Sequence, residues 1–108
     1  MLSKFTAFQI SKRFYWSCKS LKIQRLLYDQ WLSASSSVAL NIAEGSGKRT
    51  PGDQKRFYSI ALGSLRECQA IIELERIEDP DLIDLADQLG AILFKLSGNP
   101  TRPKTELN

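Results

Sequence analysis

Residues 42–57, IAEGSGKRTPGDQKRF, decide the fold of this 108-residue chain because they contain the end of one helix and the start of the next. Gly45 and Gly47 follow an apolar helical stripe, which is typical of a helix that stops in a left-handed residue, so this helix should end near Glu44. Thr50-Pro51-Gly52-Asp53 then places a capping Thr before a first-turn Pro, with an acidic residue three positions after the Thr. The stretch therefore predicts two helices joined by a short turn.

Apolar residues recur at helical spacing in four segments, and strand signals are missing. The apolar positions are Ala7, Ile10, Phe14, Cys18 and Leu21; Leu27, Trp31, Ala34, Val38 and Ile42; Phe57, Ile60, Ala61, Ser64, Leu65, Cys68, Ile71 and Ile72; and Leu82, Leu85, Ala86, Leu89, Leu93 and Leu96. Asp79-Pro80 caps the fourth segment and Gly98 closes it. Short connections favour antiparallel neighbours, so we predict an all-α, up-down-up-down four-helix bundle over residues 1–98 and a flexible tail over 99–108.

The first segment has more apolar surface than one bundle core needs. Phe5, Phe8, Tyr15 and Trp16 form a second apolar stripe beside the first. Large apolar patches that remain exposed usually mark interfaces, so this second stripe predicts a homo-oligomer or a protein partner.

The composition argues against catalysis. The chain has no His, which removes the usual general base and the commonest metal ligand. Cys18 and Cys68 lie inside apolar segments and should be core residues. Gly45-Ser46-Gly47-Lys48 does not match a phosphate-binding loop, because Ile42 and Arg49 stand where that motif needs Gly and Ser or Thr. We therefore expect no enzyme, cofactor or metal, and, without an apolar run of membrane length, a cytoplasmic protein that has no membrane partner.

The charges are unevenly distributed along the chain. The formal net charge is +3, but residues 1–66 contain 11 basic and three acidic residues, whereas residues 67–108 contain four basic and nine acidic ones. This polarity suggests an anionic partner at one place and self-complementary docking at another.

In the predicted topology, the turn between the second and third helices lies at the same end as both termini. This end collects what we call the basic rim: Lys4, Lys48, Arg49, Lys55, Arg56, Lys95, Arg102 and Lys104, against Glu44, Asp53 and Glu106. Lys48, Arg49, Lys55 and Arg56 are close enough to follow a phosphate backbone, and Tyr58, if exposed, could stack on a base. The opposite end brings Lys19, Lys22 and Arg25 near Glu75, Glu78, Asp79 and Asp81, which suits ion pairs or subunit contacts.

Two runs carry a family resemblance. Asn41-Ile42-Ala43-Glu44-Gly45 and Ala61-Leu62-Gly63-Ser64-Leu65-Arg66-Glu67 closely resemble the bacterial four-helix bundle proteins encoded in intervening sequences of 23S ribosomal RNA genes. The resemblance covers about residues 5–94 and implies a homopentameric barrel. A distant relative, the accessory protein of diversity-generating retroelements, assists a reverse transcriptase and looks like a nucleic-acid-binding partner without catalysis of its own.

The resemblance leaves the roles of Asn41, Glu44, Arg66 and Glu67 open between structure and function. Asn41 and Glu44 share a helix face, and Glu44 lies at a helix end where the dipole disfavours a carboxylate. We expect these two to tie the following turn to Arg66 or to a neighbouring protomer, with direct functional contact as the alternative. Gly63, costly inside a helix, predicts a close approach of two helices.

We therefore expect a non-enzymatic, homo-oligomeric helical scaffold that binds RNA or other structured nucleic acid through the basic rim, because cyclic repetition turns a modest patch into a ring. The alternative is an adaptor that binds a reverse-transcriptase-like or other protein partner through apolar helix surfaces.

Overall fold

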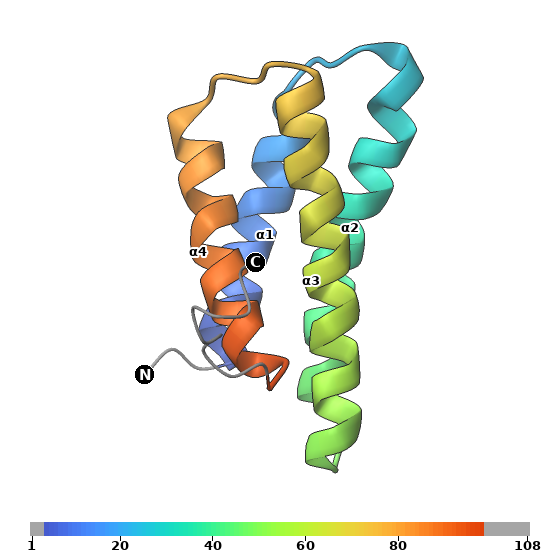
Figure 1. Cartoon of the computed structure of the whole chain (residues 1–108), viewed down its shortest axis with the longest axis vertical. Coiled ribbons are helices and arrows are strands. Elements are labelled where there is room, and N and C mark those ends of the chain that lie inside the picture. Colours follow the sequence, from blue (N-terminus) through green and yellow to red (C-terminus); the bar gives the residue numbers. More distant parts are fainter. Residues whose placement is uncertain (1–3, 99–108) are drawn as a thin grey trace, which may run out of the picture.

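The computed structural model describes residues 4–98, which form four α-helices and no strand. The helices are α1 (Lys4–Ser20), α2 (Arg25–Ser46), α3 (Pro51–Leu74) and α4 (Pro80–Leu96). They lie side by side, each packing against the next and α1 also packing against α4 (Figure 1). The α1–α2 and α3–α4 connections lie at the top of Figure 1 and the α2–α3 turn at the bottom. The prediction of an all-α chain with four helices is confirmed, and the tail predicted for residues 99–108 lies outside the described residues.

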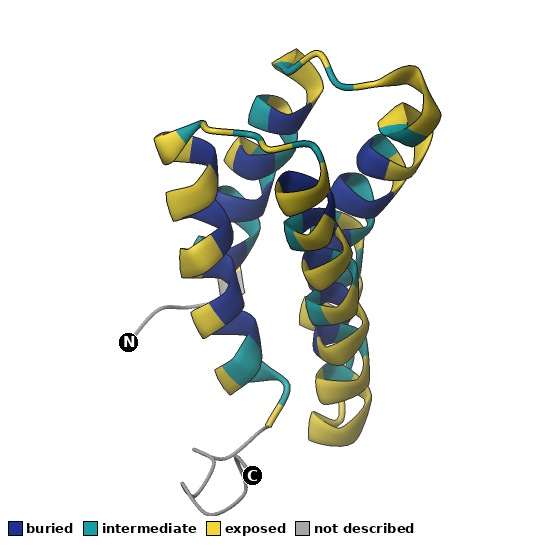
Figure 2. Ribbon diagram, turned by 45° about the horizontal axis from the view of Figure 1, so that its top comes forward, coloured by how far each residue is buried: buried dark blue, intermediate teal, exposed yellow. Residues whose placement is uncertain are grey.

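One apolar core fills the space between the helices (Figure 2). Its largest fully buried side chains are those of Phe14, Trp31 and Tyr58. The indole nitrogen Nε1 of Trp31 donates a hydrogen bond of 2.9 Å to the carbonyl oxygen of Cys18, so the polar atom of this large side chain is satisfied inside the core. Ile60, assigned to the buried stripe from its spacing, is 44% exposed and points away from the core.

The helix starts follow the predicted caps. Thr50 Oγ1 accepts a hydrogen bond of 3.2 Å from the backbone N–H of Asp53, and Asp79 Oδ1 accepts one of 3.1 Å from that of Leu82. Gly98, just after α4, has a φ of +82°, which is the left-handed conformation typical of glycine at a helix end.

The end of α2 differs from the prediction. The helix continues to Ser46, two residues past Glu44, with Gly45 buried inside it. Gly47 has a φ of −89° and is not left-handed. The glycine at position 45 therefore does not stop the helix.

The second apolar stripe of α1 is exposed at two of its four predicted positions. Phe5 is 71% and Trp16 59% exposed, whereas Phe8 and Tyr15 are partly buried. Lys12 lies over two of these rings, with Nζ 5.5 Å from the centroid of Phe8 and 5.6 Å from that of Trp16. The outer face of α1 is thus a cationic, aromatic surface.

Cys18 and Cys68 are buried, free thiols, as predicted. Burial disfavours the thiolate and raises the pKa of both, with the neighbouring Cys68 adding to the rise at Cys18 and Glu67 adding to the rise at Cys68. The pKa of Cys68 is about 12, compared with an ordinary value of 9.0. Neither thiol is suited to nucleophilic chemistry near neutral pH.

These raised pKa values predict an alkaline loss of stability. Above pH 9, the unfolded chain releases thiol protons that the folded chain still holds, so the free energy of unfolding falls by up to about 1.4 kcal/mol per pH unit for each thiol. Urea unfolding between pH 8 and pH 10.5 should show a steeper fall for the native chain than for the Cys18→Ala, Cys68→Ala variant. Equal pH slopes for the two proteins would contradict this assignment.

Candidate nucleic-acid interface

The turn between α2 and α3 is held by hydrogen bonds on both sides of Lys48. The backbone N–H of Lys48 donates to the carbonyl oxygen of Gly45 at 3.2 Å. The Lys48 carbonyl oxygen accepts a hydrogen bond of 2.9 Å from Nε2 of Gln54, in the first turn of α3. Together with the Thr50 cap, these bonds fix the backbone that carries Lys48 and Arg49.

Glu44 finds its partner in this turn. Lys48 Nζ lies 3.1 Å from Glu44 Oε2, one helical turn along the chain, and the pair is partly exposed. Arg66 is not part of this tie, since its Nη1 donates to Gln69 Oε1 at 2.8 Å. The predicted tie to Arg66 within the protomer is therefore wrong. Arg66 is eight residues beyond Tyr58, the residue that packs against Gly45, and so lies about 12 Å farther along α3.

Phe57 is the aromatic residue around which the cations gather. Lys48 Nζ lies 5.0 Å from the centroid of the Phe57 ring and the Arg56 guanidinium carbon lies 4.7 Å from it. The ring is only partly buried. Cation–π attraction thus holds two of the four predicted cations in place beside the turn.

Tyr58, assigned to base stacking on condition that it is exposed, is only 1% exposed and cannot stack in this structure. Its ring lies against the backbone of Gly45, where an added Cβ would come within 2.8 Å of Tyr58 Cε1. Its hydroxyl oxygen lies 3.4 Å from Ser46 Oγ. Tyr58 therefore supports the α2–α3 contact beneath the turn.

The remaining cations of this end are exposed. Arg49, Lys55 and Lys95 lie on the surface. A Cβ added at Gly98 would lie 2.8 Å from Lys55 Cδ, so the Lys55 side chain crosses the end of α4. The α2–α3 turn, the start of α3 and the end of α4 thus form one end of the molecule, as the basic rim requires. The side chain of Lys4, with Arg102, Lys104 and Glu106, lies outside the described residues.

Above the turn, α2 and α3 are joined by a polar seam that was not predicted. Ser37 Oγ lies 2.8 Å from Ser64 Oγ, and Asn41 Nδ2 donates to both the carbonyl oxygen and the Oγ of Ser37, at 2.9 and 3.0 Å. Asn41 therefore orders a contact between two helices, while Glu67 is exposed on α3. The abundance of small residues in these two helices was the sequence signal for this seam.

Gly63 does not mark a close helix approach. It is exposed, and a Cβ added there would meet no heavy atom within 4 Å. The close glycine in the middle of the chain is Gly45.

At the opposite end of the bundle, the sequence predicted ion pairs or subunit contacts, and the ion pairs do not form within the protomer. The backbone N–H of Gln24 donates to Glu75 Oε1 at 3.2 Å, which ties the α1–α2 connection to the end of α3. Among the described side chains of residues 5–98, however, the one ion pair is that between Lys48 and Glu44. The acidic and basic side chains at this end therefore form no ion pair with each other within the protomer, and Glu75 and Asp79 accept backbone hydrogen bonds instead.

The described residues contain no group of three or more His, Cys, Asp or Glu side chains that could hold a metal ion. Within residues 4–98, no helix has the length and apolar character needed to span a bilayer.

Comparison with known proteins gives one match. The model of the 23S rRNA-intervening sequence protein family matches residues 5–94. No curated protein and no solved structure matches the chain.

The two glycines predict opposite effects of the same substitution. Gly45→Ala should lower the free energy of unfolding by about 1–3 kcal/mol, because its methyl group meets the buried Tyr58 ring. Gly63→Ala should raise it by up to about 1 kcal/mol, because alanine favours the helix and the site is open. Urea unfolding of both variants measures the difference, and destabilisation by Gly63→Ala would show that this face of α3 is packed in solution.

Proposed function

The chain belongs to the 23S rRNA-intervening sequence protein family, and from this premise we propose that it is a non-enzymatic, homo-oligomeric scaffold of the bacterial cytoplasm that binds RNA or other structured nucleic acid through its basic rim. The observation that carries the proposal is the concentration of Lys48, Arg49, Lys55 and Arg56 around one ordered turn. Cations placed around a fixed backbone suit contact with phosphates, which supplies most of the affinity of nonspecific nucleic-acid binding.

Oligomerisation would strengthen this site without new contacts. Because the protomers of a homo-oligomer are identical, a closed homopentameric barrel would repeat the turn and its four cations as a ring. One protomer offers too few charges for tight binding, but several rims on one nucleic acid raise the effective affinity by multivalency. The exposed Phe5 and Trp16 support assembly, since isolated small domains rarely leave such aromatic surface uncovered.

The same aromatic surface favours a second candidate function. The α1 stripe exposes the aromatic side chains of Phe5 and Trp16, and aromatic residues are enriched at protein interfaces. An adaptor that binds a reverse-transcriptase-like or other protein would use this stripe and would depend little on salt. A nucleic-acid-binding rim would depend on salt steeply.

A matched pair of variants tests the rim. Arg49→Gln with Lys55→Gln removes two exposed rim cations, and Arg13→Gln with Arg66→Gln removes two exposed cations from the sides of the bundle. The rim pair should flatten the plot of log affinity for a structured RNA against log salt by about 1.5 units for each protomer that engages the RNA, and the side pair by much less. Fluorescence anisotropy with a labelled RNA hairpin between 50 and 300 mM KCl provides the measurement.

Equal flattening by both pairs would contradict a single rim. If the native oligomer binds neither RNA nor DNA at the lowest salt, the adaptor becomes the favoured function. Sedimentation of each variant before the titration ensures that the slopes compare proteins in the same assembly state.

A further inference from the structure

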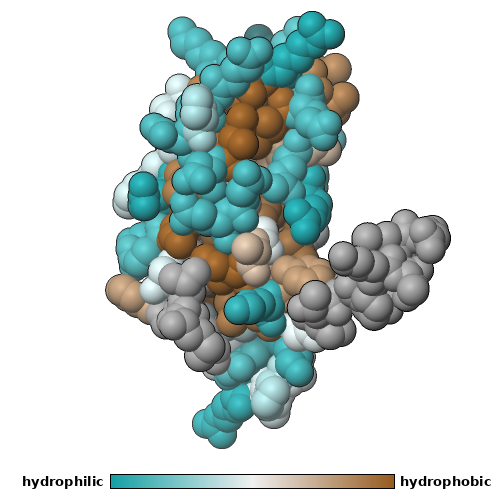
Figure 3. Space-filling model, turned by 60° about the vertical axis from the view of Figure 1, so that its left-hand side comes forward, coloured by the Kyte–Doolittle hydropathy of each residue, from teal (hydrophilic) through white to brown (hydrophobic). Residues whose placement is uncertain are grey.

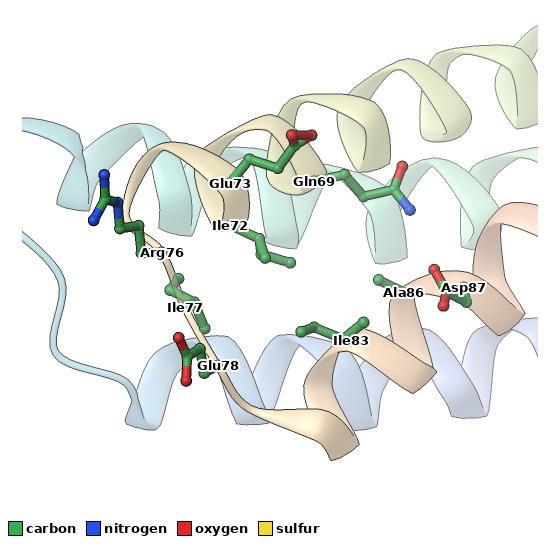
Figure 4. Close-up of a pocket in the computed structure, with 9 residues that line it drawn as sticks. All are labelled: Gln69, Ile72, Glu73, Arg76, Ile77, Glu78, Ile83, Ala86 and Asp87. Carbon is green, nitrogen blue, oxygen red and sulfur yellow. The ribbon is translucent and has the colours of Figure 1, made fainter.

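A groove with an apolar floor and an acidic margin lies between α3 and α4, at the end opposite the basic rim. Seen from the α4 side, apolar surface is visible between hydrophilic side chains near this end (Figure 3). The side chains of Ile72, Ile77 and Ile83 point into the space between the helices (Figure 4). Ile83 is exposed although it lines the groove floor, so this floor is not covered within the protomer.

Acidic residues surround this floor. Glu73, Glu78 and Asp87 line the groove, against one cation, Arg76. None of these carboxylates takes part in an ion pair with another residue of the described range. The groove therefore combines apolar surface with a net negative charge and suits an apolar side chain flanked by cations.

The same chain carries a surface of that kind. The connection from α1 to α2 bears Lys19, Lys22 and Arg25, which line a shallow hollow with Tyr28. Leu26 projects beside them and is 86% exposed. We call this surface the basic connection. It presents a protruding apolar side chain among cations, which complements the acidic groove in both hydropathy and charge.

Both surfaces lie at one end of the bundle. The hydrogen bond from Gln24 to Glu75 ties the basic connection to the end of α3, where the acidic groove begins. The α1–α2 and α3–α4 connections stand at the top of Figure 1, on different sides of the molecule. The acidic groove and the basic connection form no ion pair with each other within the protomer, so both surfaces are available to bind another molecule.

We infer that the acidic groove of one protomer binds the basic connection of a second copy of this chain, with Leu26 entering between Ile77 and Ile83. The inference rests on the homo-oligomeric part of the proposed function. Since the two surfaces differ, the contact is heterologous, and repetition closes a ring when the rotation allows it. Rotational symmetry gives every protomer of such a ring the same orientation, so the basic rims, which lie at the end opposite the contact, gather on one face of the ring.

Charge reversal tests this contact. The groove variant is Glu73→Lys with Asp87→Lys, and the connection variant is Lys22→Glu with Arg25→Glu. Each should raise the concentration at which half of the protein is assembled by roughly tenfold or more, because like charges then face each other. A chain with all four changes restores opposite charges and should assemble as the native chain does. Leu26→Ser, at an exposed position, should weaken assembly while the protomer keeps its helical content.

The control variant, Glu67→Lys with Asp84→Lys, makes the same change in net charge on α3 and α4 outside the groove lining. It should assemble as the native chain does. Sedimentation velocity and native mass spectrometry measure assembly, and far-UV circular dichroism checks that every variant keeps its helices. The interface is wrong if the control loses assembly as much as the groove variant, or if the fourfold variant fails to recover it. A monomeric native chain would overturn the assembly itself, whereas an oligomer indifferent to all of these changes would overturn only this contact and leave the RNA-binding rim standing.

Discussion

The contact between Gly45 and the ring of Tyr58 is the constraint on which the candidate site depends. Because Gly45 has no Cβ, the Tyr58 ring can lie against the backbone of α2, at a place where an added methyl group would come within 2.8 Å of it. This approach holds α2 and α3 together directly above their connecting turn, and the contact between Ser37 and Ser64 continues it along the helices. The turn is therefore short and ordered, and its cations project from a fixed base.

Helical periodicity and capping residues were sufficient to predict the four helices, because both depend on residues near one another in the sequence. Thr50 and Asp79 cap their helices through bonds that span three residues, so the local pattern determines them. The two glycines were misassigned because a glycine's role depends on which side chain faces it from another helix. The spacing did contain a signal for Tyr58, which precedes Ala61 by three residues on the buried stripe, whereas Gly63 lies on the opposite face of α3.

The structure separates basic and acidic surfaces, as the uneven charge distribution suggested. The sequence alone could not show which of the opposite charges lie next to each other. Sequence placed opposite charges together at the end distant from the α2–α3 turn, and their proximity suggested ion pairs or subunit contacts. In the fold, Glu78 lies in the acidic groove between α3 and α4, whereas Lys19, Lys22 and Arg25 line a basic surface around the α1–α2 connection. Glu75 contacts that connection through the backbone N–H of Gln24 and not through a cation. Charges that are close in a topology diagram can lie on different sides of the bundle, because each helix with its side chains is about 10 Å wide. The Coulomb energy between exposed groups is too small to draw such charges together.

Glu44 shows how the rim itself is organised. A carboxylate at the end of a helix meets the negative end of the helix dipole, and Lys48 compensates for it from one turn away. The exposed pair contributes little to stability. Its larger effect is positional, since Lys48 then lies over Phe57, where Arg56 also lies. The rim thus contains two cations that are held in place, Lys48 and Arg56, and two on exposed side chains, Arg49 and Lys55. This combination suits contact with the variably spaced phosphates of a folded nucleic acid better than recognition of the fixed pattern of base edges.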